Sequence, residues 1–309
     1  MFATTISLCP PYSFERLLYR LETHPDPLMQ VDQASRTLQY MYLLGTKPVL
    51  ARLRFTGGVD NPAIELSVNT ALTSSEQQQL EQKVRHMFSA DVDLEPIYRH
   101  MREQEKTSEL PETFRGLRFL LDPDLFQSMV RTIIGQQVNL AFATALTYRF
   151  MELAGSYVED EDGRKLLSFP TVEAVARLKP EDLRPLQFSQ RKAEYIIDFA
   201  RAIDLGSIEL DRLWHMGDEE IIAYLTKLRG IGRWSVECLM MFGMGRLDLL
   251  PAADIGLRNG IHLLYGMEEK PSEKEIRQIG EKWAPWRSYY SLYVWEIIGE
   301  EKRKSKSKK

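Results

Sequence analysis

One carboxylate in this sequence stands where it could do chemistry. Asp254 follows a turn at Pro251 and, further upstream, the glycine turn Gly230-Ile-Gly232, after which the first aromatic residue is Trp234. A lone carboxylate can stabilise positive charge that develops on a reacting group, and it can orient or activate water. An aromatic face holds an electron-poor or cationic ring by stacking and cation–π attraction. Asp254 could instead simply cap a helix over 255–265. The two roles are compatible, because a cap position holds the carboxylate still.

The glycine turn is predicted to join two helices. Gly217-Asp218 can start the first helix, with Asp218 as its N-cap, and glycine tolerates the positive φ and close backbone approach that a tight turn needs. The second helix would begin in Gly-x-Gly and leave unpaired N–H groups pointing outward, which together with the helix dipole suit a phosphate. Apolar residues recur at helical spacing on both sides of the turn: Ile221, Ile222, Leu225 and Leu228 before it, and Val236, Leu239, Met240 and Gly243 after it.

The elements that must position these groups are of two kinds. Residues 1–105 are predicted to form a small mixed α/β domain, because alternating apolar segments between turn residues are typical of half-exposed antiparallel strands. Residues 106–300 are predicted to form a helical core, and the charged run 301–309 a disordered tail. We expect strands over 29–32, 38–44, 49–55 and 64–68, helices over 12–21, 73–88, 93–102, 125–136, 139–153, 171–178, 180–186, 190–203, 255–265, 272–283 and 286–299, a linker over 103–111 and an acidic loop over 155–165.

Composition limits the class of protein. A chain of 309 residues with 44% hydrophobic and 27% charged residues is ordinary for a globular protein. No apolar run approaches the ~20 residues of a membrane helix, and no secretory leader is evident. Two cysteines, Cys9 and Cys238, indicate a reducing cytoplasm and are too few for a four-cysteine iron–sulfur cluster. The five histidines show no metal-ligand spacing, so no catalytic metal is expected. With a net charge of −4, a nucleic-acid enzyme must gather its basic residues on one face.

The glycine turn and its surroundings resemble the helix-hairpin-helix DNA glycosylases, whose mark is a Gly-Ile-Gly hairpin followed by a proline-containing turn and an Asp. The variant Gly230-Ile-Gly-Arg-Trp-Ser235 is most similar to the AlkA-type 3-methyladenine DNA glycosylases. Upstream, residues 126–139 match the early core helix of the family and its turn. Downstream, residues 283–295 match its last helix. The N-terminal third matches more loosely, through Pro10-Pro11-Tyr12 and its strand-rich pattern.

The resemblance implies an α+β fold with a small N-terminal antiparallel-sheet domain and an all-helical helix-hairpin-helix glycosylase core. The hairpin would span about 217–244, and two helical subdomains would flank an active-site cleft. The implied enzyme is a DNA-3-methyladenine glycosylase II, a hydrolase that removes bases of the 3-methyladenine and 7-methylguanine type in base-excision repair. In bifunctional relatives a lysine attacks the sugar; here Trp234 stands in its place, which implies a monofunctional enzyme. Asp254 would stabilise the cationic sugar or orient water, and a base that is already positively charged leaves without a general acid.

Further residue roles come with the resemblance. A DNA phosphate is expected at Gly230, Gly232, Arg233 and Trp234, and the base pocket at Trp234 and Trp295, although Trp295 is equally explained by core packing. Gln137, at the tip of the turn 136–138, matches the wedge that fills the gap left by an extruded base; loop polarity is the alternative explanation. The other residues considered are Arg131, Lys227, Arg229 and Arg258 as phosphate partners, and Asp248, which lies near Asp254 but does not match the family position.

Two positions depart from the AlkA pattern. Cys238 and Ile255 stand where that pattern has aromatic residues, so the pocket is expected to be less aromatic and the lesion preference stays open. No organic cofactor is expected, and a structural monovalent cation held by carbonyls of the hairpin is implied by the family alone. The expected partner is double-stranded DNA that contains alkylated bases, bound by a cytoplasmic monomer without a membrane contact. Two alternatives remain: a non-catalytic module for damaged DNA, which the retained Asp254 opposes, and a bifunctional oxidised-base glycosylase/lyase, which Trp234 opposes.

Overall fold

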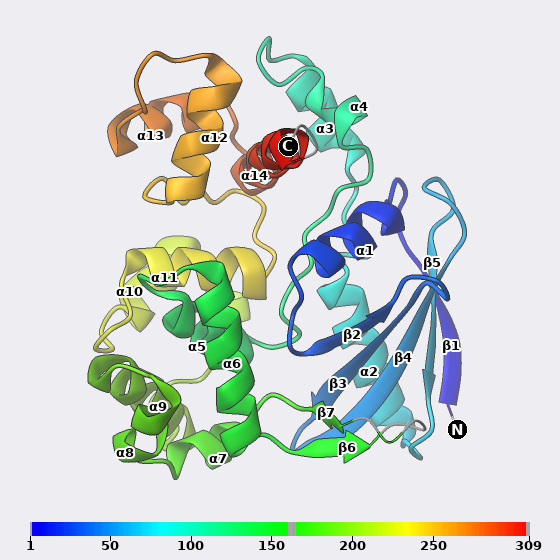
Figure 1. Ribbon diagram of the computed structural model, residues 1–309, viewed down its shortest axis with the longest axis vertical. Helices are drawn as coiled ribbons and strands as arrows, with labels where there is room; N and C mark the ends of the chain where they lie inside the picture. Colours follow the sequence, from blue (N-terminus) through cyan, green and yellow to red (C-terminus); the bar gives the residue numbers. More distant parts are fainter. Residues whose placement is uncertain (1, 160–162, 164, 307–309) are drawn as a thin grey trace.

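The protein consists of a sheet with two helices and two groups of helices, and the chain passes between them more than once (Figure 1). This computed structural model describes residues 2–159, 163 and 165–306. One helical group contains α5 to α11. The other contains α12 to α14 together with α3 and α4, which come earlier in the sequence. The predicted α+β fold is therefore confirmed, with an N-terminal antiparallel sheet followed by a helical core.

The sheet is antiparallel and has the strand order β1-β5-β4-β3-β2. Its strands are β1 (Phe2–Ser7), β2 (Met29–Asp32), β3 (Thr37–Leu44), β4 (Lys47–Thr56) and β5 (Ala63–Val68). On β4, buried Leu53 and Phe55 alternate with exposed Arg52 and Arg54, as expected when one face packs on a core and the other meets solvent. Helix α1 (Phe14–Thr23) contacts β2, and α2 (Ser74–Met87) contacts β3 and β1. β1 was missing from the sequence prediction.

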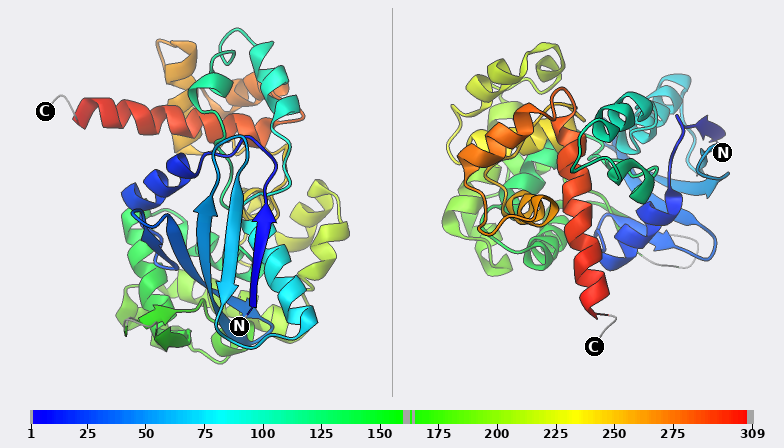
Figure 2. Two further views of the ribbon diagram at one scale, coloured as in Figure 1. Left: turned by 90° about the vertical axis from the view of Figure 1, so that its right-hand side faces the viewer. Right: turned by 90° about the horizontal axis from the view of Figure 1, so that it is seen from above.

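The helical part begins with two short elements that lie against the end of the chain. Helices α3 (Glu95–Arg102) and α4 (Leu110–Thr113) sit beside α14, which runs between them and α12–α13 (Figure 2). The Tyr293 hydroxyl donates a hydrogen bond to the Tyr98 hydroxyl at 3.0 Å, and His100 Nδ1 lies within hydrogen-bond distance of the Tyr290 hydroxyl, at 2.8 Å. A helix inside the predicted domain 1–105 thus packs on the last helix of the chain, and the domain boundary at 105/106 stays a prediction.

The remaining helices surround the glycine turn. They are α5 (Leu125–Gly135), α6 (Leu140–Ala154), α7 (Val172–Ala176), α8 (Pro180–Leu183), α9 (Gln190–Asp204), α10 (Asp218–Leu225), α11 (Arg233–Cys238), α12 (Ile255–Tyr265), α13 (Glu273–Glu281) and α14 (Arg287–Lys306). Short 3-10 helices η1 (Arg184–Leu186) and η2 (Asp211–His215) lie among them, and α11 continues into the π-helix η3 (Leu239–Gly243). Among the described helices, none is long and apolar enough to span a bilayer.

Three local predictions need correction. Gly217, not Asp218, is the N-cap of α10, because the Glu220 side chain accepts from the Gly217 N–H and Asp218 is already helical. The segment predicted as an acidic loop over 155–165 contains the hairpin β6 (Tyr157–Glu159) and β7 (Lys165–Leu167); residues 160–162 and 164 lie outside the described part. The predicted tail 301–309 is helical as far as Lys306, and 307–309 also lie outside it.

An ion-pair cluster joins the N-terminal region to the helical core. The guanidinium of Arg131 on α5 donates to Asp26, before β2, at 2.5 Å and to Asp122 at 3.1 Å. Gln127 connects this cluster to the sheet, since it donates to Asp122 at 3.1 Å and accepts from the Tyr40 hydroxyl at 3.0 Å. The three charged side chains are largely buried, with 28% of Arg131 and 14% of each carboxylate side chain exposed.

We predict that Arg131→Met lowers the free energy of unfolding by roughly 2–4 kcal/mol, because it leaves two poorly solvated carboxylates without their cation. The matched control is Arg54→Met, which breaks the exposed Arg54–Glu65 pair and should cost less than about 1 kcal/mol. Urea denaturation followed by circular dichroism measures both. Equal losses in the two variants would contradict the anchoring role of Arg131.

Candidate active site

Asp254 is held by two hydrogen bonds to one of its oxygens. It is the N-cap of α12, where its Oδ1 accepts from the Leu257 N–H at 2.6 Å, and the same Oδ1 accepts from the indole Nε1 of Trp295 at 2.9 Å. Its own N–H donates to the Pro251 carbonyl at 2.8 Å, which closes the predicted turn. The side chain of Asp254 is half-buried. Oδ2 has no hydrogen-bond donor among the described residues, so the protein orients one carboxylate oxygen and leaves the other without a hydrogen bond.

Two glycines on α12 let α14 bring Trp295 to this carboxylate. A Cβ on Gly256 would lie 3.2 Å from Trp295 Cδ1 and 3.0 Å from Asp254 Oδ1, and a Cβ on Gly260 would lie 2.3 Å from Val294 Cγ1. Gly256 and Gly260 are four residues apart and therefore lie on the same face of α12. This face has no side chains at the two positions where α14 crosses, so the two helices can pack closely. The N-terminus of α14 is also fixed to the loop before α12, because Ser288 Oγ accepts a hydrogen bond from the Leu249 N–H at 3.0 Å.

Among the described residues, Trp295 packs against one aromatic ring, and the cysteine near Asp254 is not a nucleophile. Phe242 on η3 stacks on the Trp295 ring with centroids 5.9 Å apart. Trp234, at the start of α11, is half-buried. Cys238 is buried next to these groups, and burial, with smaller effects of the negative Asp254 and Glu237, raises the pKa of its thiol well above the ordinary value. The thiol is therefore protonated at neutral pH, and it fills space rather than attacking a substrate.

The hairpin turn has the geometry that its glycines predict. Gly230 has φ +86°, and a Cβ there would lie 2.1 Å from the ring of Tyr195 on α9. Gly232 is the N-cap of α11, with φ −96°, and a Cβ there would meet nothing within 4 Å. Gly230 thus allows close packing on α9, whereas Gly232 keeps the start of α11 open to solvent. The exposed N-terminus of α11 fits the expected phosphate contact, which stays a prediction.

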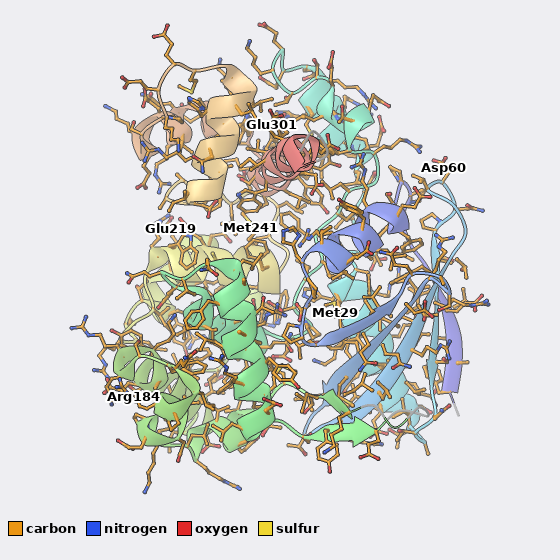
Figure 3. The ribbon with its side chains drawn as sticks, viewed as in Figure 1. Met29, Asp60, Arg184, Glu219, Met241 and Glu301 are labelled. Carbon is orange, nitrogen blue, oxygen red and sulfur yellow. The ribbon has the colours of Figure 1, made fainter. Side chains whose placement is uncertain are left out.

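The arginines beside the hairpin are engaged with carboxylates. Arg233 forms a two-point pair with Glu219, at 2.6 and 3.1 Å, and contacts Glu237 at 3.0 Å. Glu219 lies near α11, on the side of this helical group that faces α12 and α13 (Figure 3). Arg229 pairs with Glu194 at 2.8 Å and Asp198 at 3.2 Å. A DNA phosphate would have to compete with these carboxylates for either guanidinium.

The other predicted phosphate partners have different outcomes. Arg131 was one of the plausible phosphate partners, and its guanidinium pairs with Asp26 and Asp122 between the sheet and α5, so a phosphate contact by Arg131 stays a prediction without support from this geometry. Lys227 and Arg258 are exposed, and they stay candidates. Asp248, the acid near Asp254, forms a two-point ion pair with Arg287 at 2.6 and 2.8 Å. Asp248 therefore has a structural partner at the start of α14, in keeping with its mismatch to the family position.

The predicted wedge, Gln137, is exposed and has a left-handed backbone with φ +56°. It follows Gln136, whose side chain reaches across to the hairpin. Gln136 Nε2 donates to the Gly230 carbonyl at 3.0 Å and to Ser235 Oγ at 2.9 Å. The turn that carries Gln137 and the hairpin are therefore physically joined, although nothing in their sequence spacing predicted this contact.

Side chains of the described part of the site do not form a metal-binding cluster. Among the described residues, no group of three or more His, Cys, Asp or Glu side chains could hold a metal ion. A monovalent cation at the hairpin would therefore depend on backbone carbonyls. Those of Leu228 and Gly230 already accept hydrogen bonds, from the Ile231 N–H and from Gln136. Each carbonyl has a second lone pair, so the turn can still accommodate such an ion, and the cation stays a prediction.

Several residues that shape the site were absent from the sequence prediction. Phe242 stacks on Trp295, Gln136 bridges to the hairpin, and Gly256 and Gly260 admit α14. The Gly-x-x-x-Gly spacing on α12 is a signal that could have indicated close helix packing. A hollow of about 370 Å³ between α4 and α14 has none of the predicted site residues in its wall.

Comparisons with known proteins identify the family of this chain. The family model described as "HhH-GPD superfamily base excision DNA repair protein" matches residues 130–285. The "Putative DNA-3-methyladenine glycosylase YfjP" of Bacillus subtilis (strain 168) is 36% identical over 299 residues, covering 96% of this chain and 100% of that protein. A 3-methyladenine DNA glycosylase from Archaeoglobus fulgidus superposes with a TM-score of 0.81 at 26% identity, covering 96% and 97% of the two chains. The Schizosaccharomyces pombe 3-methyladenine DNA glycosylase Mag1, solved with abasic DNA, gives 0.57 at 28% identity, covering 65% and 95%.

We predict that the two hairpin glycines differ in their tolerance of a side chain. Gly230→Ala should lower the free energy of unfolding by roughly 2–4 kcal/mol, because alanine at positive φ is strained and its Cβ would displace the Tyr195 ring. Gly232→Ala, the matched control with open space and negative φ, should cost less than about 1 kcal/mol. Thermal and urea unfolding measure both, and a Gly232→Ala loss as large as that of Gly230→Ala would show that this account of the turn is mistaken.

Proposed function

The chain belongs to the HhH-GPD superfamily of base excision DNA repair proteins, and we propose that it is a monofunctional DNA glycosylase that hydrolyses the N-glycosidic bond of alkylated bases. The substrate class is the 3-methyladenine and 7-methylguanine type. Support comes from relatives that bear the name of this activity and align over nearly the whole chain. The observation that carries the proposal is the fixed carboxylate of Asp254, with one oxygen held and the other open.

Asp254 serves the step in which positive charge builds on the sugar. As the C1′–N bond breaks, its electron pair leaves with the base and C1′ becomes cationic. The open Oδ2 can stabilise this charge and can accept the proton of the water that adds to C1′. Because Oδ1 is held by the Leu257 N–H and the Trp295 indole, the carboxylate needs no reorientation during the reaction. The products are the free base and an abasic sugar.

The aromatic surroundings suit a base that carries positive charge. Trp234 and Trp295 can stack on an extruded, electron-poor base and hold it by cation–π attraction. A cationic alkylated purine leaves as a neutral molecule, so the site needs no general acid. Cys238 and Ile255 make this region less aromatic than the AlkA pattern, and Ile255 is largely exposed. The preference among alkylated bases is best measured across a panel of lesions.

The partner we propose is double-stranded DNA that contains alkylated bases. The open N-terminus of α11 at Gly232 would receive a phosphate, with Arg233 and Trp234 beside it, and Gln137 would enter the gap left by the extruded nucleotide. A relative solved with abasic DNA supports a DNA partner. We further propose that the enzyme acts as a monomer in the cytoplasm. Trp234 in place of a lysine nucleophile supports hydrolysis rather than lyase chemistry.

We expect Asp254→Asn to lower single-turnover release of methylated bases by at least about 10²-fold, because a neutral amide cannot stabilise the cationic sugar. Binding to a duplex with an abasic-site analogue should persist. The measurement is chromatography of bases released from methylated duplex DNA.

Asp248→Asn provides the matched control for this experiment. It removes an acid only six positions away that belongs to an ion pair with Arg287, so stability should fall while excision continues. Undiminished base release by Asp254→Asn would refute the catalytic assignment. If the wild-type protein binds damaged DNA without releasing any base, a non-catalytic module is the better description.

A second prediction concerns the indole that orients the carboxylate. Trp295→Phe keeps an aromatic ring against Phe242 but removes the Nε1–H donor to Asp254. The single-turnover rate should fall about tenfold, the cost of one hydrogen bond to a charged group, with little change in DNA affinity. Trp214→Phe, at an exposed tryptophan of η2, controls for loss of an indole in general. Equal rates in wild type and Trp295→Phe would exclude this role.

A further inference from the structure

We propose that Lys192 on α9 is a positioning residue for the DNA wedge, holding the turn that presents Gln137 in register with the hairpin. The inference rests on the proposed function, since it assigns a role within the same DNA-binding face. Its basis is a set of hydrogen bonds at Gln136, the residue directly before the exposed Gln137: Lys192 on α9 donates to the Gln136 carbonyl, and the Gln136 side chain donates to the hairpin.

Lys192 neutralises the end of the helix that leads to the wedge. Its Nζ donates to the Ile134 carbonyl at 2.7 Å and to the Gln136 carbonyl at 2.9 Å. The last carbonyls of a helix lack intrahelical partners and carry partial negative charge, and α5 has no basic residue in its own last turn. Lys192 thus supplies this charge from another helix. Burial lowers the pKa of its ammonium group, in keeping with a position between packed elements rather than in open solvent.

The backbone at the wedge needs this support. Gln137 has φ +56°, a left-handed conformation that costs a residue with a Cβ roughly 1–2 kcal/mol. Such a conformation persists only where the surroundings determine it. The peptide unit between Gln136 and Gln137 contains the carbonyl that Lys192 binds, so the ammonium group fixes the plane from which the exposed side chain projects.

The same helix also supports the phosphate-binding turn. Tyr195 follows Lys192 by three residues, so both lie on one face of α9. The ring of Tyr195 packs under Gly230, at the place where a Cβ would lie 2.1 Å away. Gln136 completes the link, because its side chain donates to the Gly230 carbonyl and to Ser235. Helix α9 therefore contacts both turns, through Lys192 at the wedge and through Tyr195 at the hairpin, and so sets the distance between them.

The test compares excision from duplex and single-stranded DNA, because only a duplex needs a wedge. Lys192→Met keeps the aliphatic stem and removes the charge. It should lower single-turnover release of methylated bases from duplex DNA by at least about tenfold while release from single strands changes by less than about twofold. A 2-aminopurine placed beside an abasic-site analogue in a duplex should also show a smaller fluorescence increase on binding. Lys192→Arg should restore most of both signals, because it returns a cation to the same carbonyls.

Lys274→Met, at an exposed lysine of α13, is the matched control and should leave every reading unchanged. If Lys192→Met unfolds, Gln136→Met removes the side-chain donors with similar volume and should show the same duplex-selective loss. Equal losses on duplex and single strands, or an unchanged duplex rate, would overturn the inference. The fluorescence reading separates this proposal from the proposed function: absence of base release from every variant counts against the glycosylase, whereas an unchanged 2-aminopurine response in Lys192→Met counts against the wedge support.

Discussion

The site depends on one constraint, the double hydrogen bond to Asp254 Oδ1. The Leu257 N–H comes from the first turn of α12 and the indole N–H comes from Trp295 on α14, so two helices must keep their relative position for the carboxylate to stay oriented. That position is set by the bare backbone at Gly256 and Gly260 and by the contact of Ser288 with the loop before α12. A group that is already oriented stabilises developing charge without a reorganisation cost.

The N-terminal sheet contributes to the position of α5, although it is remote from Asp254. None of the predicted site residues lies on a strand, yet the cluster of Arg131, Asp26 and Asp122 ties the sheet to α5, the helix that ends at the wedge turn. A buried ion pair adds little net stability compared with an apolar contact, but it is specific in direction and geometry. The ion-pair cluster therefore fixes α5 against the sheet, while Lys192 on α9 binds the carbonyl of Ile134 at the C-terminal end of α5.

The charge arrangement bears on how an acidic protein would hold DNA. The two arginines next to the hairpin are already paired with carboxylates, Arg233 with Glu219 and Arg229 with Glu194. In the proposed complex a phosphate would meet backbone N–H groups at Gly232 first, and these carry no net charge. The Arg233–Glu219 pair is exposed, and exchange of such a pair costs little, so in the proposed complex a phosphate could replace Glu219 while Arg233 keeps its contact with the buried Glu237.

The sequence alone determined the elements whose signals are local. The helix over 255–265 and its Asp254 cap, the helix over 73–88, and the glycine turn at Gly230 follow from residue types within one or two turns of chain, where hydrogen-bonding partners are close in sequence. Local signals failed where a partner came from elsewhere. β1 is a strand because β5 pairs with it, and the predicted tail is helical to Lys306 as a continuation of α14.

Tertiary structure alone decided which side chains meet. Trp295 reaches Asp254 across 41 positions, Gln136 reaches Gly230 across 94, and Arg131 reaches Asp26 across 105. A side chain's type states what it can bind, but only the packing of helices states what stands within about 3 Å of it. For this reason Asp254 could be proposed as the lone acid from the sequence, whereas the groups that orient it, and those that contact the proposed wedge turn, could not.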